Sequence, residues 1–257
     1  MEKSVLVDLT LCIGCRGCQV ACKEWNERKA SITSFKGDFT NPVKLSSECY
    51  TNIRFVETIK QTRPVWSFVK NQCLHCKIPA CVSACPVGAL TKSDLGPVLY
   101  SFDKCIGCRY CMLACPFDIP KYEWESTQPW MQKCSFCSEL IKEDMLPVCI
   151  KTCPTGTLYF DDYDKIVAKA KKRIKDNPQK YVNHIYGLTE AGGTNWIYLS
   201  DVSFKQLGFK ENIPTIPLPD VTWPFLSAIP GKITGIAVLL SAIAYFRTRG
   251  IREEDSQ

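Results

Sequence analysis

The chemistry of this chain is concentrated in its cysteines. Sixteen of the 17 cysteines among 257 residues fall into four tight groups, and only Cys49 lies outside them. The groups are Cys12, Cys15, Cys18 and Cys22; Cys73, Cys76, Cys81 and Cys85; Cys105, Cys108, Cys111 and Cys115; and Cys134, Cys137, Cys149 and Cys153. Groups one and three follow C-x2-C-x2-C-x3-C, the spacing at which thiolates bind the irons of cubane [4Fe–4S] clusters. The sequence therefore predicts four [4Fe–4S] clusters.

Two other uses of grouped cysteines fit this pattern less well. Disulfide frameworks belong to short secreted domains, and cysteines two residues apart rarely meet the geometry needed to bridge one another. Structural zinc takes four ligands around one ion, usually two from each of two separated loops. In groups one and three, three thiols lie within seven residues, which suits three corners of one cluster.

The remaining two groups vary the same loop. Group two widens its second gap to four residues, and group four carries an insertion, residues 138–148, between its second and third cysteines. A proline follows the last cysteine of groups two, three and four but not of group one. The chain therefore repeats one loop four times, in two similar halves.

The formal net charge of +6 does not indicate a nucleic-acid partner. An oxidised cluster core of about 2+ bound by four thiolates leaves each site at about −2. Four such sites bring the loaded protein to a net charge of about −2. We therefore expect no nucleic acid among the partners.

Alternating and apolar segments predict the elements that hold the loops. Residues 5–9 read as a strand directly before group one, and residues 53–69 as a β-hairpin inserted between groups one and two. Residues 196–199 read as a buried strand. An amphipathic pattern predicts a helix over residues 162–175, capped by Asp161 or Asp162.

Together these elements predict an α+β fold. We expect a four-cluster domain over residues 1–210, built from two bacterial-ferredoxin-like halves with insertions. A proline-rich linker follows at residues 211–224, then a C-terminal transmembrane helix at 225–246 and a polar tail at 247–257.

The apolar segment 225–246 has the length of a membrane span. As a helix it would extend about 33 Å, against a hydrocarbon core of about 30 Å. Lys232 interrupts it, however, and the uninterrupted part is only 233–246. A buried core helix or a helix that docks on a partner is therefore the alternative.

Flanking charges predict how such a helix would be oriented. Arg247, Arg249 and Arg252 follow the segment, whereas Lys232 and the more distant Lys210 precede its apolar part. The positive-inside rule then places the C-terminus in the cytoplasm and the cluster domain on the periplasmic side of the inner membrane. The first residues show neither a charged leader with an apolar core nor a twin arginine, so we expect export with a signal-bearing partner.

Several segments resemble the four-cluster iron–sulfur subunits of membrane-bound molybdo- or tungsto-oxidoreductases and of related uptake hydrogenases. The resemblance is strongest to the beta subunit of respiratory formate dehydrogenase. The segments that carry it are Cys12–Cys15, Cys22–Asn26, Cys115–Pro120, Lys151–Gly156, Gly187-Leu188 and Gly192–Thr194, followed by the single apolar helix. It extends over almost the whole chain.

The resemblance implies which cysteines share a cluster, because in two-cluster ferredoxins the fourth cysteine of each run ligates the other cluster. Groups one and four would form one half, and groups two and three the other. The implied sets are Cys12, Cys15 and Cys18 with Cys153; Cys134, Cys137 and Cys149 with Cys22; Cys73, Cys76 and Cys81 with Cys115; and Cys105, Cys108 and Cys111 with Cys85.

The function that the resemblance implies is electron transfer. Electrons would pass from a catalytic molybdenum or tungsten formate dehydrogenase subunit to a quinone-reactive membrane subunit of the cytochrome b type. The same role in a membrane-bound [NiFe] uptake hydrogenase is the alternative. No catalytic residue is expected in the chain itself, since His75 and His184 are its only histidines and both read as packing or surface residues, as Cys49 does.

Overall fold

The computed structural model describes residues 1–254 apart from residues 36, 61, 126, 128 and 129. It divides into two units, Met1–Leu218 and Pro219–Gln257. The first unit contains short helices and small sheets, and the second contains most of one long helix. The predicted α+β fold is confirmed, and the last three residues of the predicted tail 247–257 lie outside the described part of the chain.

A three-stranded sheet forms the centre of the first unit. Its order is β8 (Leu158–Asp162), β1 (Lys3–Asp8) and β9 (Trp196–Leu199). The central strand β1 pairs antiparallel with β8 and parallel with β9. The sheet therefore ties the N-terminal residues to two segments from the last third of the unit.

The two faces of β1 pack against different layers, as its alternating sequence requires. Leu6 packs with Ile166 and Ala170 of helix α6 (Tyr163–Asp176), and all three side chains are fully buried. Val5 and Val7 belong to the other core, on the side of the cysteine loops. Burying one such aliphatic side chain contributes about 2 kcal/mol to folding.

Helix α6 begins one residue later than predicted, after Asp162. The Asp162 side chain makes no capping hydrogen bond; its oxygens instead pair with Lys3 at 2.7 Å and Lys165 at 3.0 Å. Asp162 thus occupies the predicted cap position, but its side chain does not cap the helix, because two ammonium groups bind the carboxylate.

The predicted β-hairpin is present as β2 (Asn52–Lys60) and β3 (Arg63–Asn71), paired antiparallel. One face carries Phe55, Trp66 and Phe68, whose rings contact one another edge to face. Next to it lie the loop and helices of the first and fourth cysteine groups. These elements are η1 (Leu9–Leu11), α1 (Gly17–Trp25), α4 (Ser138–Lys142) and α5 (Val148–Lys151).

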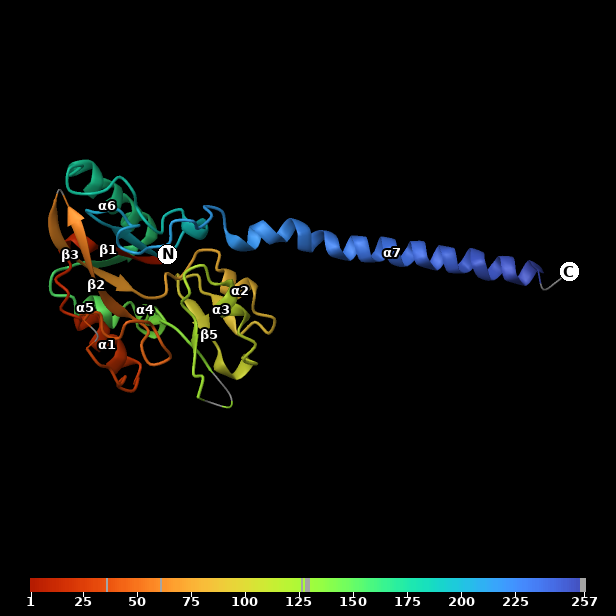
Figure 1. Ribbon diagram of the computed structural model, residues 1–257, viewed down its shortest axis with the longest axis horizontal. Coiled ribbons are helices and arrows are strands. Elements are labelled where there is room, and N and C mark those ends of the chain that lie inside the picture. The colour runs from red at the N-terminus through yellow and green to blue at the C-terminus, as the bar shows by residue number, and fades with distance from the viewer. Residues whose placement is uncertain (36, 61, 126, 128–129, 255–257) are drawn as a thin grey trace. The chain divides into compact units, whose positions relative to one another are not determined.

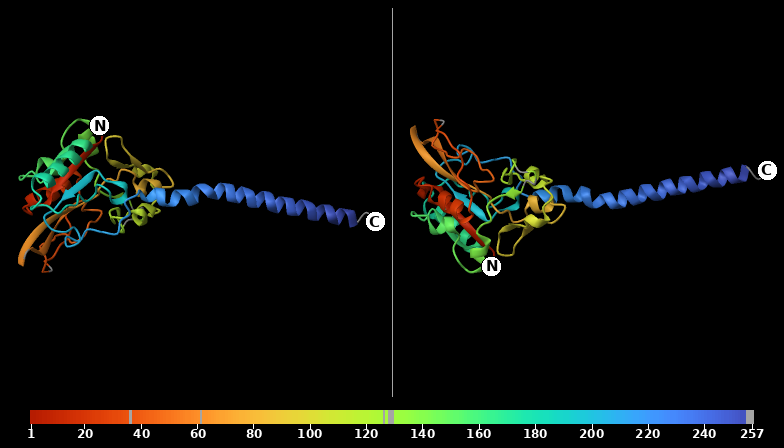
Figure 2. Two further views of the ribbon diagram at one scale, coloured as in Figure 1. Left: turned by 90° about the horizontal axis from the view of Figure 1, so that it is seen from above. Right: turned by 90° about the horizontal axis from the view of Figure 1, so that it is seen from below.

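The second and third cysteine groups lie in a separate, smaller half of the same unit. Figure 1 shows α2, α3 and β5 together, away from α1, α5 and the hairpin, and the two views of Figure 2 agree. The elements of this half are α2 (Ala80–Ser83), β4 (Leu90–Lys92), β5 (Val98–Tyr100), η2 (Phe102–Lys104), α3 (Tyr110–Ala114), β6 (Lys121–Tyr122) and β7 (Met131–Gln132).

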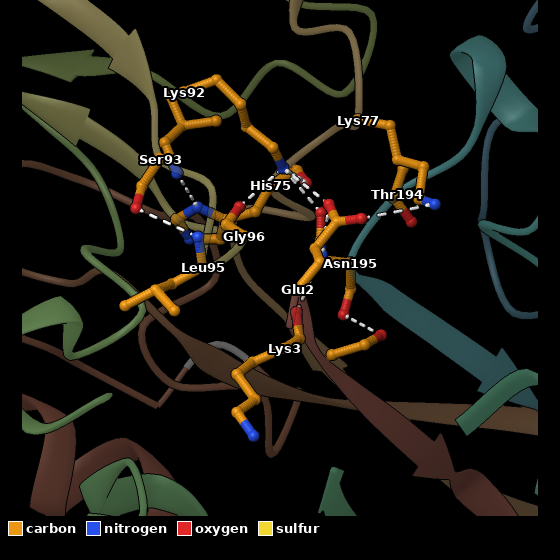
Figure 3. A network of polar contacts seen from close by, with 12 residues as sticks. Glu2, Lys3, His75, Lys77, Lys92, Ser93, Leu95, Gly96, Thr194 and Asn195 are labelled. Atoms are coloured by element: carbon orange, nitrogen blue, oxygen red, sulfur yellow. Dashed lines mark hydrogen bonds and ion pairs between the residues drawn. The ribbon is translucent and has the colours of Figure 1, made fainter. Parts of the chain in front are cut away.

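A polar network joins the smaller half to the central sheet (Figure 3). Asn195, fully buried just after the 3₁₀ turn η3 (Glu190–Gly192), donates to Glu2 Oε1 at 2.9 Å and to the carbonyl of Lys3 at 2.8 Å. Its own oxygen accepts from Lys92 Nζ at 2.7 Å, and its backbone N–H points to the carbonyls of Leu74 and His75. One amide thus connects the N-terminus with the loop of the second cysteine group.

The C-terminal helix α7 runs from Leu218 to Glu254. It is longer at both ends than the predicted 225–246. At the N-terminal end, Pro219 is compatible with the first turn of a helix. At the C-terminal end, residues 247–254 include good helix formers, so the helix continues beyond the apolar segment. The segment Leu218–Thr248 of this helix is long enough to cross a membrane, and its most apolar stretch, with a mean hydropathy of 1.7, is apolar enough to do so.

The Asn195 network generates a stability prediction. Asn195→Ala removes three side-chain hydrogen bonds and leaves the partly buried Lys92 ammonium with fewer acceptors, so we expect a loss of about 3 kcal/mol. Thermal unfolding of the purified protein, followed by circular dichroism, should show a lower midpoint. Asn183→Ala, at an exposed position, is the matched control and should change stability by less than about 0.5 kcal/mol. Equal midpoints for both variants would contradict the role of the network.

Candidate metal centres

The loops of groups one and three have the same backbone conformation. Gly14 and Gly107 have φ values of 67° and 68°, and Arg16 and Arg109 are both left-handed, at 61° and 65°, directly before helices α1 and α3. A side chain at position 14 could not be accommodated, because its Cβ would lie 2.8 Å from the Phe68 ring. The sequence repeat is therefore also a repeat of backbone geometry.

The arginines of the two loops also make equivalent contacts. The Arg16 guanidinium lies 4.7 Å from the centre of the Phe55 ring, and that of Arg109 lies 4.3 Å from the centre of the Trp124 ring. Cation–π contacts of this kind hold the side chain against the protein. Each loop is thereby held by an aromatic residue that lies outside its own cysteine group.

Cys12, Cys15 and Cys18 line one cavity together with Cys153, which follows helix α5; we call this set site A. The cavity encloses about 360 Å³. Its other walls are mostly apolar and include Ile13, Ile53, Pro154 and Leu158. Site A therefore joins two segments more than a hundred residues apart in the sequence.

A second cavity, of about 340 Å³, is lined by Cys134, Cys137 and Cys149 together with Cys22; this set is site B. Helix α1 connects the two sites, because it carries Cys18 in its first turn and Cys22 one turn further along the same face. Helix α5, which packs against α1, carries Cys149, and Cys153 follows it. Each helix thus supplies one thiol to each site.

The smaller half brings together two further sets. Cys76 lies close enough to three other thiols to interact with them electrostatically, namely Cys73, Cys115 and Cys81. We call these four thiols site C. Cys105, Cys108 and Cys85 are the corresponding neighbours of Cys111, and these four form site D. Helices α2 and α3 pack together between them. The structure thus brings together the same four sets that the resemblance implied.

The four sites form a series. Cys134 of site B interacts electrostatically with Cys73 of site C across the boundary between the halves, and Cys81 of site C interacts with Cys111 of site D. With A and B joined by helix α1, the order is A, B, C, D. Only Cys15 of site A and Cys108 of site D are exposed among the sixteen grouped thiols. The two ends of the series therefore reach the surface, beside the exposed Ile13 and Ile106.

Burial makes these thiols poor acids in the absence of a bound cation. Desolvation raises the pKa of Cys12 to about 11 and that of both Cys81 and Cys134 to about 12. Since the thiolate is the form that binds iron, a metal must supply the compensating charge. Cys153 differs: burial acts to raise its pKa, but the N–H groups of Leu158, Thr155 and Thr157 and the Thr155 hydroxyl lower it overall.

The donor sets fit cubane clusters. Each set offers four thiols, and in a [4Fe–4S] cluster each iron takes one thiolate. Among the described residues, no three His, Cys, Asp or Glu side chains are close enough together to hold a single metal ion. The thiols of sites A and B surround a volume instead, and backbone N–H groups point at a sulfur in each half, as from Phe136 to Cys134 at 3.3 Å and from Ala89 to Cys85 at 3.2 Å.

The two histidines and the ungrouped cysteine lie apart from these sets. His75 is fully buried, accepts a hydrogen bond from the Val98 N–H through Nδ1 at 2.9 Å, and packs against Phe136. Its Nε2 has no partner among the described residues. His184 is half exposed and bonds Glu190, and Cys49 donates to the carbonyl of Thr51.

Sequence reasoning missed one charged residue at the sites. Lys70 of strand β3 lines the cavities of both site A and site B, although its side chain is only 3% exposed. The signal in the sequence was a single lysine in the apolar end of a strand, three residues before Cys73. Such a lysine usually points to solvent, so the pattern alone could not reveal it.

Comparison with known proteins places these observations in a family. Two family models, both described as a 4Fe-4S dicluster domain, match residues 64–163 and 11–89. A protein of Nitratidesulfovibrio vulgaris is 40% identical over 95% of this chain, which spans 66% of that protein's length. A formate dehydrogenase iron-sulfur subunit of Haemophilus influenzae is 32% identical over 99% of this chain and 83% of its own length.

A hydrogenase relative also matches. The hydrogenase-2 operon protein HybA of Escherichia coli O157:H7 is 35% identical over 79% of this chain and 71% of its own length. The formate dehydrogenase-O iron-sulfur subunit of Escherichia coli K12 is 33% identical over 99% of this chain and 87% of its own length. The predicted family is confirmed: this chain belongs to the [4Fe–4S] dicluster iron–sulfur subunits that include those of formate dehydrogenases.

Proposed function

We propose that this chain is an electron-transfer subunit that carries four [4Fe–4S] clusters, one each at sites A, B, C and D. The observation that supports this most directly is the series of four adjacent four-thiol sets. Sixteen thiols for four clusters give every iron a protein ligand. No iron then has the open coordination position that substrate chemistry at a cluster requires, and electron transfer is the remaining use.

A [4Fe–4S] cluster supplies one-electron redox chemistry when bound. The chain contributes position, insulation and tuning. The buried cysteines Cys22, Cys134 and Cys149 keep site B from water, whereas Cys15 and Cys108 leave one corner of each terminal site near the surface. Electrons would therefore enter at one end of the series and leave at the other, through sites B and C.

The electron donor we propose is the catalytic subunit of a molybdenum or tungsten formate dehydrogenase, and the acceptor a quinone-reactive membrane subunit of the cytochrome b type. Support comes from the formate dehydrogenase iron-sulfur subunits, which match over 99% of this chain. The alternative is the equivalent subunit of a membrane-bound [NiFe] uptake hydrogenase, which the 35% identity to HybA favours.

We further propose that helix α7 spans the inner membrane once. Its apolar part is long enough, and Ile233, Ile236, Leu239 and Leu240 are exposed along it. The arginines at positions 247, 249 and 252 would keep the C-terminus in the cytoplasm. The cluster unit would then lie on the periplasmic side, exported with a signal-bearing partner.

The ligand sets predict an unusual effect of substituting the last cysteine of group three. Cys115→Ser should damage site C rather than the site of its own loop, and iron should fall from about 16 to about 12 atoms per chain. Its reduced EPR spectrum should match that of Cys76→Ser (site C) and differ from that of Cys108→Ser (site D). Cys49→Ser is the control and should retain all the iron. A spectrum of Cys115→Ser that matches Cys108→Ser instead would show that the sets are assigned incorrectly.

The membrane proposal predicts how the chain fractionates. The full-length protein should remain with membranes after washes with high salt and with alkaline carbonate. Replacing Leu239 and Leu240 by arginine should release it, because each charge near the helix centre costs about 3 kcal/mol. Leu146→Arg, at an exposed leucine of the first unit, should remain with the membranes. Release of the unmodified protein by salt alone would mean that α7 does not span.

The choice between donors is tested on the isolated complex. Formate added under anaerobic conditions should produce the EPR signals of reduced clusters, and hydrogen gas should not. Reduction by hydrogen but not by formate would replace the first proposal with the hydrogenase alternative. Identifying the largest subunit of the same preparation by mass spectrometry provides an independent check.

A further inference from the structure

Lys70 is a buried cation for which the protein offers no carboxylate. Its side chain is 3% exposed, and none of the described carboxylates lies within ion-pairing distance of it. Nζ donates to Thr51 Oγ1 at 2.6 Å and lies 5.3 Å from the centre of the Trp196 ring. A hydroxyl and a ring face do not offset the cost of burying an ammonium group.

Two other lysines near the sites, the partly exposed Lys92 and the buried Lys133, have different partners. Lys92 pairs with Glu2 and with the oxygen of Asn195, and Lys133 donates to the carbonyls of Val98 and Cys134. Their charges are therefore balanced or solvated by oxygen atoms of the protein. Lys70 alone among the three has neither a carboxylate nor a carbonyl on its ammonium in the described structure.

The groups around Lys70 that can carry a negative charge are cysteine sulfurs from two sites. Burial acts to lower its pKa, but Cys18 of site A and Cys149, Cys22 and Cys134 of site B raise it overall. The same side chain lines both cavities. Strand β3 places it there, in register with Ile53 of the hairpin strand β2. The ammonium group thus lies between the four-thiol sets of sites A and B and interacts electrostatically with both.

We propose that Lys70 sets the reduction potentials of the clusters at sites A and B, through a fixed positive charge that both share. The proposal rests on the proposed cluster content. Adding one electron takes a site from a net charge of about −2 to about −3. A nearby cation favours the more negative state, so it raises the reduction potential of each site, and no proton needs to be taken up.

A shared cation has a second effect on transfer between the two sites. When an electron moves from site A to site B, site A is oxidised and site B is reduced, and the total charge around Lys70 does not change. The ammonium therefore stabilises the electron on either site, so Lys70 raises both potentials and does not by itself create a difference between them. Lys70 therefore acts only through the charge state of the two clusters. It contacts no substrate.

The experiment is an EPR-monitored redox titration, with dithionite as reductant, of the purified complex containing wild type, Lys70→Met, Lys70→Gln or Lys70→Arg. Met and Gln remove the charge and approximate the length, whereas Arg retains the charge. In the neutral variants, two of the four cluster components should become about tenfold harder to reduce, a shift of about 59 mV to lower potential for a one-electron couple. In Lys70→Arg all four should stay close to their wild-type potentials.

Lys60→Met is the matched control, because Lys60 lies on the same hairpin but pairs with Asp201 and lines neither the site A nor the site B cavity; its four potentials should be unchanged. Wild-type iron near 16 atoms per chain tests the cluster content separately. Unchanged potentials in loaded neutral variants, equal shifts of all four components, or a shift in Lys70→Arg like that of Lys70→Met would overturn the proposal.

Failure to load iron is also informative. If Lys70→Met and Lys70→Gln lose the clusters of sites A and B while Lys70→Arg retains about 16 irons, the positive charge is required for both sites, and the proposal stands. If Lys70→Arg loses them as well, the shape of lysine matters rather than its charge. That outcome would refute the proposal.

Discussion

The fold depends on how neighbouring cysteine loops share their thiols. The last cysteine of each loop lies with the first three cysteines of its neighbour. In each half, two short helices pack together, and each helix, taken with the residues that directly follow it, gives thiols to two sites; α1 does so with Cys18 and Cys22. An α-helix places residues i and i+4 on one face about 6 Å apart, so a single turn of helix fixes the separation of neighbouring sites. The hairpin, the central sheet and helix α6 then serve to hold these helix pairs in place.

Much of this arrangement could be predicted from the sequence, because cysteine spacing and strand alternation are local signals. The four loops, the hairpin at β2–β3 and helix α6 were found in this way. The partners of β1 were not, since strands 150 and more residues apart carry no local sign of pairing. The four thiol sets followed from a resemblance and not from spacing, and their role as cluster ligands stays a prediction. Spacing cannot say which loops fold together.

The partners of charged side chains were the feature that the local sequence predicted least well. Asp162 has the residue type of a helix cap, yet its carboxylate binds Lys3 and Lys165. Lys70 reads as a surface residue of a strand, yet it is among the most buried polar side chains. In both cases the deciding partner comes from a distant segment: the N-terminal strand for Asp162, and the cysteine loops for Lys70. Electrostatic roles of this kind appear only after the tertiary structure has brought the groups together.

The position of β1 at the centre of its sheet has a consequence for biosynthesis. Strand β1 leaves the ribosome before its partners, because β8 and β9 are made about 150 and 190 residues later, and Cys153 of site A is made about 140 residues after Cys12. Sites C and D, in contrast, are complete once residue 115 has been made. Because domains form as their residues emerge, the smaller half can mature during translation while the larger half stays open. On the proposed ligand sets, loading of sites A and B would therefore have to wait until residue 153 has been made, after the thiols of sites C and D are complete.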